Sequence, residues 1–275
     1  YRDIYWAFPD YRERVGAALA TAMGCVYRYD LAWYSRYIDR LYLPSMRMGA
    51  HVPGFPEERM APLPPGCEIV DEAPSSRPDG ELHLLYIGGL GGHYRLQECL
   101  RAVVDVPGTS LTICTRPAQW ETAGDQYADL VEAACGRIEV VHRSGEELAA
   151  LYERADLCVL FVEPDPYREF ASPVKLYEYL GRGKPVIASQ GTLAAEVVGA
   201  AGAGWTLPYA ATVLCGLLRR LLQHPQEVAE AAGRARQARQ EHTWLSRART
   251  VAQDMQAVRA GALARARTLR AGGDR

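Results

Sequence analysis

From residue 81 onward, short apolar runs alternate with stretches whose apolar residues recur every three or four positions. Short apolar runs are typical of buried strands, and the longer spacing is typical of amphipathic helices. The expected strands are 82–88, 110–115, 137–142, 156–162 and 184–189, and the expected helices are 94–104, one within 119–135, 145–155 and 173–182. This alternation predicts right-handed βαβ crossovers, and therefore an α/β fold with a Rossmann-like parallel sheet.

The first part of the chain has a different texture. Residues 1–70 are rich in tyrosine and tryptophan, with one helix expected near 10–27, a strand at 39–45 and a proline-dense linker over 51–80. About 50 residues are too few to bury a core of ordinary size. We therefore expect 1–70 to be the C-terminal remnant of an incomplete N-terminal domain plus linker, and the start at Tyr1 instead of Met favours a missing upstream segment.

The last part is predicted to be helical. Residues 207–242 would complete a middle domain of 71–243, and 244–275 would form a crossover helix with a basic tail. In that helix Trp244, Ala248, Val251, Met255 and Val258 form a narrow apolar stripe that should lie on a protein surface. The tail carries seven arginines against two aspartates from residue 243 on. This charge fits a solvated face or peripheral contact with the cytoplasmic side of a membrane.

Composition narrows the class of function. The 31 lysines and arginines against 33 acidic residues give a net charge of -2, so no nucleic-acid partner is expected. The seven cysteines are scattered through apolar runs, which suits buried thiols in the cytoplasm. The histidines form no metal-binding pattern, so we expect neither a metal nor another cofactor. No apolar run reaches the roughly 18–20 residues of a membrane span, and no secretory signal is visible.

The stretch SPVKLYEYLGRGKPVIAS, 172–189, contains the only two lysines of the chain. Ser172 and Pro173 predict a helix start at the carboxyl end of the fourth strand, the edge of a parallel sheet where ligands bind. The first-turn amides of Val174 and Lys175 favour an anion, and the ammonium of Lys175 adds charge there. Glu178, on the same helical face, could accept hydrogen bonds from a ribose diol. Together these groups describe a nucleoside-diphosphate site.

The alternative for this helix is a set of surface ion pairs. Lys175 with Glu178, and Glu178 with Arg182, would each contribute about 0.3–0.5 kcal/mol without binding anything. Lys184 precedes a strand, and we expect it to be a solvated charge at the strand end.

A glycine-rich turn, GGLGGHYR at 88–95, follows the first expected strand. Gly88, Gly89 and Gly91 would let the backbone approach a phosphate, and Arg95 would face the same sheet edge. A tight structural turn is the alternative. A nicotinamide-cofactor fold is disfavoured because Tyr94 replaces the third glycine of G-x-G-x-x-G and no carboxylate ends the second strand.

His142 and Arg143 leave the third expected strand at this edge, where they could line a pocket for the base. The alternative is a structural or solvent-facing histidine. The sequence shows no nucleophile elbow, P-loop or Ser/His/Asp arrangement.

With these motifs in this order, residues 80–243 resemble the C-terminal domain of GT-B glycosyltransferases of group 1 (family 4). The stretches RDIYWAFPDY and YIDRLYLPSMRM resemble the end of that family's N-terminal domain, and Trp244 onward resembles its crossover helix. The resemblance implies two stacked domains that hold a nucleotide-sugar donor in their cleft.

The resemblance also implies residue roles. The second glutamate of the family's E-x7-E pair binds the ribose and matches Glu178, and the amides that hold the diphosphate match Val174 and Lys175. An arginine and a lysine that grip the phosphates match Gly89 and Arg95, so one cation is absent. Lys175 would compensate, which makes Lys175 and Arg95 the expected catalytic cations.

One departure concerns the donor sugar. The first glutamate of the pair, which contacts the sugar in the family, matches Phe170, and Glu169 is one residue away.

The implied reaction is hexosyl transfer to an unknown acceptor, with retention and without metal, in polysaccharide or other glycoconjugate biosynthesis. We expect this chain alone to bind nucleotide but to transfer sugar poorly, because the acceptor side belongs to the N-terminal domain or to a partner chain. The alternative is a non-catalytic donor-binding subunit. A sugar-nucleotide epimerase is disfavoured because no paired carboxylates are found.

Overall fold

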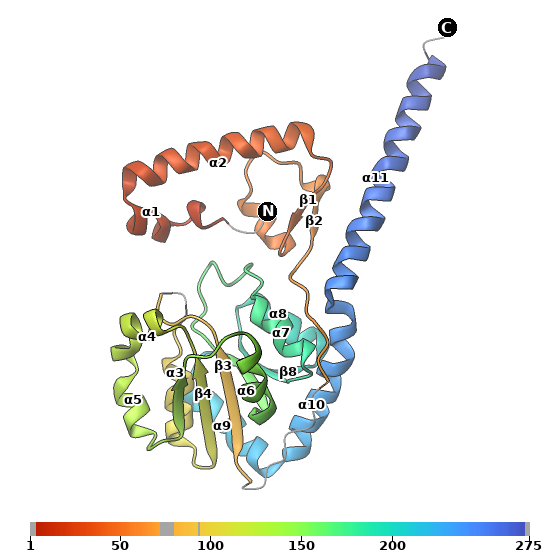
Figure 1. Cartoon of the computed structure of the whole chain (residues 1–275). Helices are drawn as coiled ribbons and strands as arrows, with labels where there is room; N and C mark the ends of the chain where they lie inside the picture. The colour runs from red at the N-terminus through yellow and green to blue at the C-terminus, as the bar shows by residue number, and fades with distance from the viewer. Residues whose placement is uncertain (1–3, 72–79, 93, 273–275) are drawn as a thin grey trace. The chain divides into compact units, whose positions relative to one another are not determined.

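The computed structural model describes residues 4–71, 80–92 and 94–272 (Figure 1). The chain divides into two compact units, one of Tyr1–Pro65 with Trp244–Arg275 and the other of Gly66–Thr243. The larger unit begins a few residues before the expected position 71. Its first residues belong there because the Cys67 N–H donates a hydrogen bond to the His242 carbonyl at 2.8 Å.

The larger unit is built on a six-stranded sheet in which every pairing is parallel. The strand order is β5-β4-β3-β6-β7-β8, so the chain winds outward from β3 and then returns to β6. This confirms the predicted Rossmann-like α/β class and places a switch point between β3 and β6, where such sheets bind ligands. The strands are β3 (Leu82–Ile87), β4 (Thr109–Cys114), β5 (Ile138–Val141), β6 (Leu157–Leu160), β7 (Val186–Ser189) and β8 (Gly204–Leu207).

Helices cover both faces of this sheet, as Figure 1 shows. Alternate side chains of each strand enter opposite cores: Leu84 of β3 packs in the core beneath α3, α5 and α9, and Leu85 packs in the core beneath α6, α7 and α8. The helices are α3 (Gln97–Asp105), α4 (Pro117–Ala123), α5 (Ala128–Ala133), α6 (Leu148–Arg154), α7 (Val174–Gly181), α8 (Leu193–Ala201), α9 (Ala211–Gln223) and α10 (Pro225–Ala238).

Several expected elements differ from the structure. The sequence predicted five strands, but β8 and the α8 helix before it were missed, because their residues lie in a run rich in alanine and glycine without clear period. The helix expected at 94 begins at Gln97, since the Tyr94 N–H closes a turn by donating to the Gly91 carbonyl at 2.9 Å. The single helix expected within 119–135 is two helices, α4 and α5.

The smaller unit contains two helices where one was expected near 10–27. Gly16, with a φ of 86°, separates α1 (Pro9–Val15) from α2 (Ala17–Tyr37). The linker prediction over 51–80 is wrong for β2 (Met60–Pro62), which pairs with β1 (Leu41–Leu43) in a parallel ladder. Residues 72–79 of that linker lie outside the described residues.

The last helix of the smaller unit is α11 (Trp244–Gly272). Within the predicted apolar stripe, Trp244, Ala248 and Met255 are exposed, whereas Val251 and Val258 are half-buried. Polar contacts with the rest of the unit include Asp254, which accepts a hydrogen bond from the Tyr42 hydroxyl at 3.0 Å and pairs with Arg40 at 3.6 Å, and Arg247, which donates to the Pro65 carbonyl at 3.4 Å. Within the described part of the chain, none of the helices combines the length and the apolar character needed to cross a membrane.

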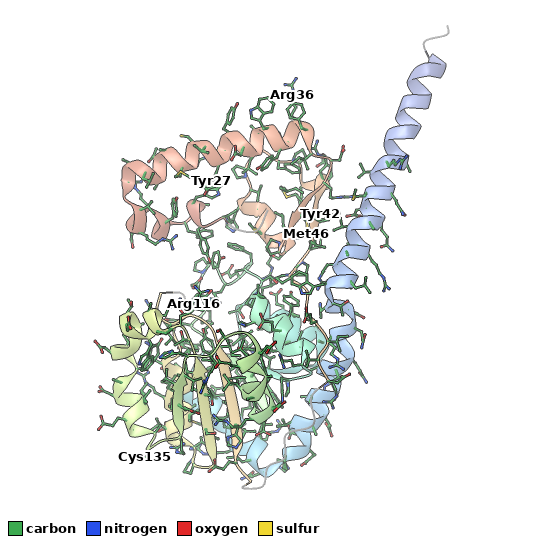
Figure 2. All side chains as sticks on the ribbon, viewed as in Figure 1. Tyr27, Arg36, Tyr42, Met46, Arg116 and Cys135 are labelled. Atoms are coloured by element: carbon green, nitrogen blue, oxygen red, sulfur yellow. The ribbon has the colours of Figure 1, made fainter. Side chains whose placement is uncertain are left out.

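The thiols provide a test of the packing. Cys25 and Cys135 are exposed, whereas the other five cysteines are buried, and burial raises the pKa of the Cys99 thiol to about 12 (Cys135 is labelled in Figure 2). Thiolates are the reactive form. We therefore expect a thiol reagent at neutral pH to modify Cys25 and Cys135 quickly, and the others only after denaturation. Mass spectrometry of the labelled peptides checks this, and fast labelling of Cys99 in the folded chain would contradict it.

Candidate functional site

The α7 helix starts at the carboxyl end of the sheet, one residue later than predicted. Its N-cap is Pro173, and no side chain caps it. The Ser172 hydroxyl, expected as the cap, instead forms a hydrogen bond with the Tyr177 hydroxyl at 2.8 Å. The first-turn amides of Val174 and Lys175 have no partner within the helix, as at any helix start. These amides can bind an anion.

Lys175 and Glu178 are brought together on one face of α7. The Lys175 ammonium contacts Glu178 Oε2 at 2.5 Å, and the two side chains are only 29% and 35% exposed. The Tyr152 hydroxyl of α6 donates to the same carboxylate oxygen at 3.3 Å, and burial raises the pKa of Tyr152 far above its ordinary value. The first pair of the ion-pair alternative is therefore present, but it includes a third group that holds Glu178 in place.

Arg182, the other member of the predicted ion-pair set, lies over the Tyr152 ring, with Cζ 4.2 Å from the ring centroid. This stacking fixes the tyrosine whose hydroxyl contacts Glu178. Glu178 is therefore held by Tyr152, and Tyr152 in turn by Arg182.

The prediction for Lys184 is wrong. Its side chain is not solvated but buried at 6% exposure, and its ammonium donates to the Ala155 carbonyl at 2.8 Å. Ala155 caps the carboxyl end of α6, where the helix dipole favours a cation. Lys184 thus has a structural role, away from α7's exposed face.

A tyrosine connects α7 to the first strand of the sheet. The Ile87 N–H at the end of β3 donates to the Tyr179 hydroxyl at 2.9 Å, and this buried hydroxyl has a pKa raised by burial. Because Gly88 follows Ile87 directly, Tyr179 sets the distance between α7 and the glycine-rich turn.

The glycine-rich turn is shaped by Tyr86. The Tyr86 hydroxyl donates to the Gly89 carbonyl at 2.7 Å, and a Cβ on Gly88 would come within 2.7 Å of that hydroxyl. Gly91 adopts a φ of 75°, the left-handed region that glycine favours. Gly88, Gly89 and Gly91 therefore form a tight turn at the switch point of the sheet.

His142 and Arg143 follow β5 at the same sheet edge. The His142 ring contacts the Thr115 carbonyl at the end of β4 through Nδ1 at 2.9 Å, so the ring is oriented. The Arg143 guanidinium pairs with Glu147 at 3.2 Å, with both side chains more than half exposed. His142 is thus held beside the strand ends, whereas Arg143 remains at the solvent-facing side of its loop.

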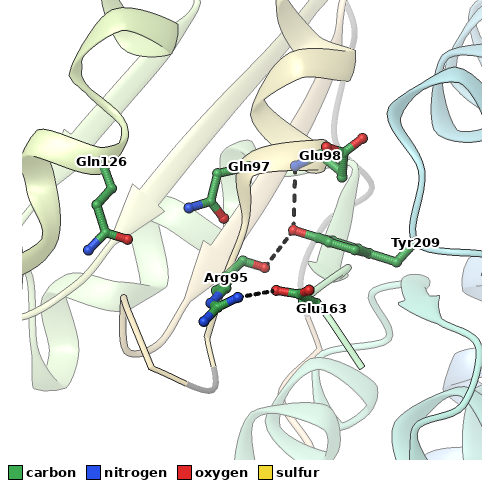
Figure 3. A pocket seen from close by; sticks show the side chains of 6 residues that line it. All are labelled: Arg95, Gln97, Glu98, Gln126, Glu163 and Tyr209. Carbon is green, nitrogen blue, oxygen red and sulfur yellow. Dashed lines mark hydrogen bonds and ion pairs between the residues drawn. The ribbon is translucent and has the colours of Figure 1, made fainter. Parts of the chain in front are cut away.

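Arg95 lines a pocket of about 340 Å³, shown in Figure 3. Its guanidinium pairs with Glu163 at 2.9 Å, and the Tyr209 hydroxyl donates to its carbonyl at 2.9 Å. Arg95 does not share the Lys175–Glu178 contact. Its pair with Glu163 is about half exposed, and such pairs contribute roughly 0.2–1 kcal/mol, so an incoming anion could displace the carboxylate at little cost. The pocket is lined by Arg95, Gln97, Glu98, Gln126, Glu163 and Tyr209.

Two residues of the loop between β6 and α7 add to this picture. Phe170, at the position matched to the sugar-contacting glutamate, is buried and packs against Tyr167 with ring centroids 5.2 Å apart. Arg168, which the sequence analysis did not single out, is buried with its guanidinium 4.0 Å from the Tyr94 ring centroid. No local sequence signal marks a buried arginine, since its surroundings come from a turn more than 70 residues away.

The strand ends therefore bring together the glycine-rich turn, His142 and the start of α7. In the described residues, no group of three or more histidine, cysteine, aspartate or glutamate side chains has the arrangement of a metal site. The chemistry offered is that of amides, cations and one positioned carboxylate, which suits an anionic ligand carrying hydroxyl groups.

Comparison with solved structures supports the fold. Sucrose-phosphate synthase from Thermosynechococcus elongatus superposes with a TM-score of 0.62 at 20% identity, over 84% of this chain and 62% of that one. HepE from Anabaena, solved with UDP, superposes with a TM-score of 0.69 at 14% identity, over 84% of this chain and 67% of HepE. WaaG, a glycosyltransferase involved in lipopolysaccharide biosynthesis, superposes with a TM-score of 0.55 at 19% identity, over 73% of this chain and 58% of WaaG. The chain thus spans 58–67% of the length of these proteins.

Sequence comparison identifies the family. No curated protein matches the chain significantly. The profile of a family described as glycosyl transferase-like matches residues 95–253, which is more than half of the chain and includes β4 to α10. The chain therefore belongs to the group 1 glycosyltransferases of the GT-B fold.

Proposed function

We propose that this chain is the donor-binding part of a glycosyltransferase that takes a sugar from a nucleoside diphosphate. The observation that carries the proposal is the start of α7. There, two uncapped amides, the Lys175 ammonium and the Glu178 carboxylate lie within one turn of each other, and Tyr152 supports Glu178. In this proposal the amides and Lys175 hold the diphosphate, and Glu178 accepts hydrogen bonds from the ribose.

The remaining predicted residues complete the site. The glycine-rich turn of Gly88, Gly89 and Gly91 lies one residue beyond the Tyr179 hydrogen bond to Ile87, so its backbone can approach the diphosphate. His142 and Arg143 are proposed to border the base.

In the transfer step the bond between the anomeric carbon and the diphosphate oxygen breaks, and the diphosphate leaves with the bonding electron pair and gains negative charge. The anomeric carbon forms a new bond to a hydroxyl oxygen of the acceptor, whose proton passes to the departing diphosphate or to water. Lys175, and Arg95 once released from Glu163, are proposed to stabilise the charge of the departing diphosphate together with the α7 dipole. Retention and independence from metal remain part of the proposal, as do a hexose donor and a role in polysaccharide biosynthesis.

UDP is the nucleotide that the comparisons favour, because HepE was solved with UDP and with UDP-glucose. In this proposal the acceptor is bound by another domain or by a partner chain. A cytoplasmic location is supported by seven cysteines without disulfides. Peripheral membrane contact through the arginine-rich tail is a further part of the proposal.

A second candidate is a non-catalytic donor-binding module. Phe170 favours it, because a buried phenylalanine replaces the carboxylate expected to contact the donor sugar. The two candidates differ in turnover: the module binds nucleotide-sugar without consuming it, even when the acceptor-binding part is supplied.

The test of nucleotide binding is thermal stabilisation by UDP, GDP, ADP and dTDP. A ligand at 100 times its dissociation constant adds about 2.7 kcal/mol to the free energy of unfolding. We expect one of the four nucleotides to raise the melting temperature clearly and the other three to raise it less. The absence of stabilisation by all four would overturn the proposal.

A further inference from the structure

Arg168 is a cation in an unusual setting. It lies in the loop between β6 and α7 and is only 7% exposed. Its backbone is fixed on both sides: its N–H donates to Asp165 Oδ1 at 3.0 Å, and its carbonyl accepts from the Leu193 N–H at 3.0 Å. A buried guanidinium carries its charge into a poorly solvated region, and here that region is the carboxyl edge of the sheet, where ligands bind.

The guanidinium of Arg168 lies against the glycine-rich turn. Its Cζ is 4.0 Å from the centroid of the Tyr94 ring, which closes the turn. It is also near enough to the Tyr86 hydroxyl to offset part of the rise that burial causes in the pKa of Tyr86. That hydroxyl donates to the Gly89 carbonyl. The positive charge therefore lies next to the Tyr94 ring and near the tyrosine that holds the Gly89 carbonyl.

The family resemblance places a phosphate-binding arginine at position 89, which is glycine in this chain. A Cβ on Gly89 would lie 3.3 Å from Tyr94 Cδ2, so the Tyr94 ring would have to shift by a few tenths of an ångström to admit a side chain there. Arg168 contacts this same ring from another loop. A cation is thus kept near the turn, but it comes from the loop that leads into α7.

We propose that Arg168 is a positioning residue for the donor diphosphate: its buried charge holds the glycine-rich turn against the α7 loop and supplies the positive potential that Gly89 lacks. The proposal rests on the proposed function. It has a physical basis, because a charge in a poorly solvated site acts on a nearby anion more strongly than one in water. Arg168 and Lys175 would then act on the diphosphate from two sides.

The opposing interpretation is that Arg168 only stabilises the loop by stacking on Tyr94. The two differ in how the effect depends on ligand charge. A structural role weakens all nucleotides alike, whereas an electrostatic role weakens a diphosphate more than a monophosphate.

The experiment compares Arg168→Gln and Arg168→Lys with the parent chain. Titration calorimetry gives the dissociation constants of the diphosphate and monophosphate of the base selected by the thermal screen, UDP and UMP if it is uridine. We expect Arg168→Gln to weaken the diphosphate about tenfold or more and the monophosphate clearly less. Arg168→Lys keeps the charge, so its ratio of the two constants should stay near the parent's.

An equal loss for both nucleotides, or no loss for either, would overturn the role of Arg168. Lys175→Ala separates this outcome from failure of the proposed function: if Lys175→Ala loses the diphosphate and Arg168→Gln does not, only the inference fails. If the parent binds none of the four nucleotides, both fail. Should Arg168→Gln not fold, Tyr94→Leu removes the ring on which the guanidinium stacks. The preference for the diphosphate over the monophosphate, taken as the monophosphate dissociation constant divided by the diphosphate one, must then fall about threefold, and an unchanged preference overturns the proposal.

Discussion

Gly181→Ala is expected to lower the free energy of unfolding of the larger unit by about 1–3 kcal/mol, the usual cost of an overpacked site. Gly181 is the last residue of α7, and the chain segment that enters the unit crosses it closely. An added Cβ would lie 2.3 Å from the Glu68 carbonyl oxygen and 2.9 Å from the Cys67 Cβ. Real Cβ atoms do not approach a backbone oxygen this closely, so the entering segment must move.

Movement there is opposed by hydrogen bonds. The Val70 N–H donates to the Gly181 carbonyl at 3.1 Å, and the buried Arg239 donates to the same carbonyl and to that of Val70, each at 3.2 Å. Arg239 also pairs with Asp71. Shifting the segment would therefore weaken these bonds as well as the packing.

Thermal denaturation measures the effect, and about 1–3 kcal/mol corresponds to roughly 2–12 °C for a unit of this size. Gly216→Ala is the matched control, because Gly216 is an exposed position within α9 where a Cβ meets nothing within 4 Å. It should leave the melting temperature unchanged or raise it, since alanine favours helices over glycine by up to about 1 kcal/mol. A Gly181→Ala chain as stable as the parent would show that the entering segment is not held as described.

Lys175→Ala is expected to weaken nucleoside-diphosphate binding by one to two orders of magnitude, because charge-assisted hydrogen bonds contribute about 1.5–3 kcal/mol. Glu178→Ala should have a comparable effect through the ribose. The two roles separate with a 2′-deoxynucleotide: the parent should prefer UDP over 2′-deoxy-UDP, and the Glu178→Ala chain should lose most of that preference. Lys175→Ala should keep the preference while binding both ligands more weakly.

Arg220→Ala is the control for these variants. Arg220 and Glu227 form a 2.8 Å ion pair remote from the sheet's carboxyl edge, so its loss should leave nucleotide affinity unchanged. If Lys175→Ala and Glu178→Ala also leave affinity unchanged and alter only stability by a few tenths of a kcal/mol, their contact is a surface ion pair and no more. Calorimetric titration of the four chains decides between these outcomes.

The sequence predicted the parallel sheet well because its central strands are buried on both faces and read as continuous apolar runs. The four residues of β6, Leu157–Leu160, are an example: all are buried. The edge strand β8 was missed because it has no continuous buried apolar run. Its four residues are only partly buried, and its start at Gly204 follows an Ala/Gly-rich segment.

The site was predictable only where its groups share one short element. Val174, Lys175 and Glu178 lie within five residues, so helical geometry alone places them together. Contacts between distant segments were not accessible: neither the burial of Lys184 beneath α6 nor the position of Arg168 behind Tyr94 has a local pattern. Arg168 and Tyr94 lie in two loops far apart in the sequence, and only the fold brings these loops to the same strand ends.

The most direct measurement is a crystal structure of the chain with the nucleoside diphosphate that stabilises it most. We expect the diphosphate at the Val174 and Lys175 amides, the ribose hydroxyls at the Glu178 carboxylate, and the glycine-rich turn facing the diphosphate. A nucleotide whose diphosphate lies away from Val174 and Lys175, or one that leaves Lys175 and Glu178 paired only with each other, would contradict the proposal.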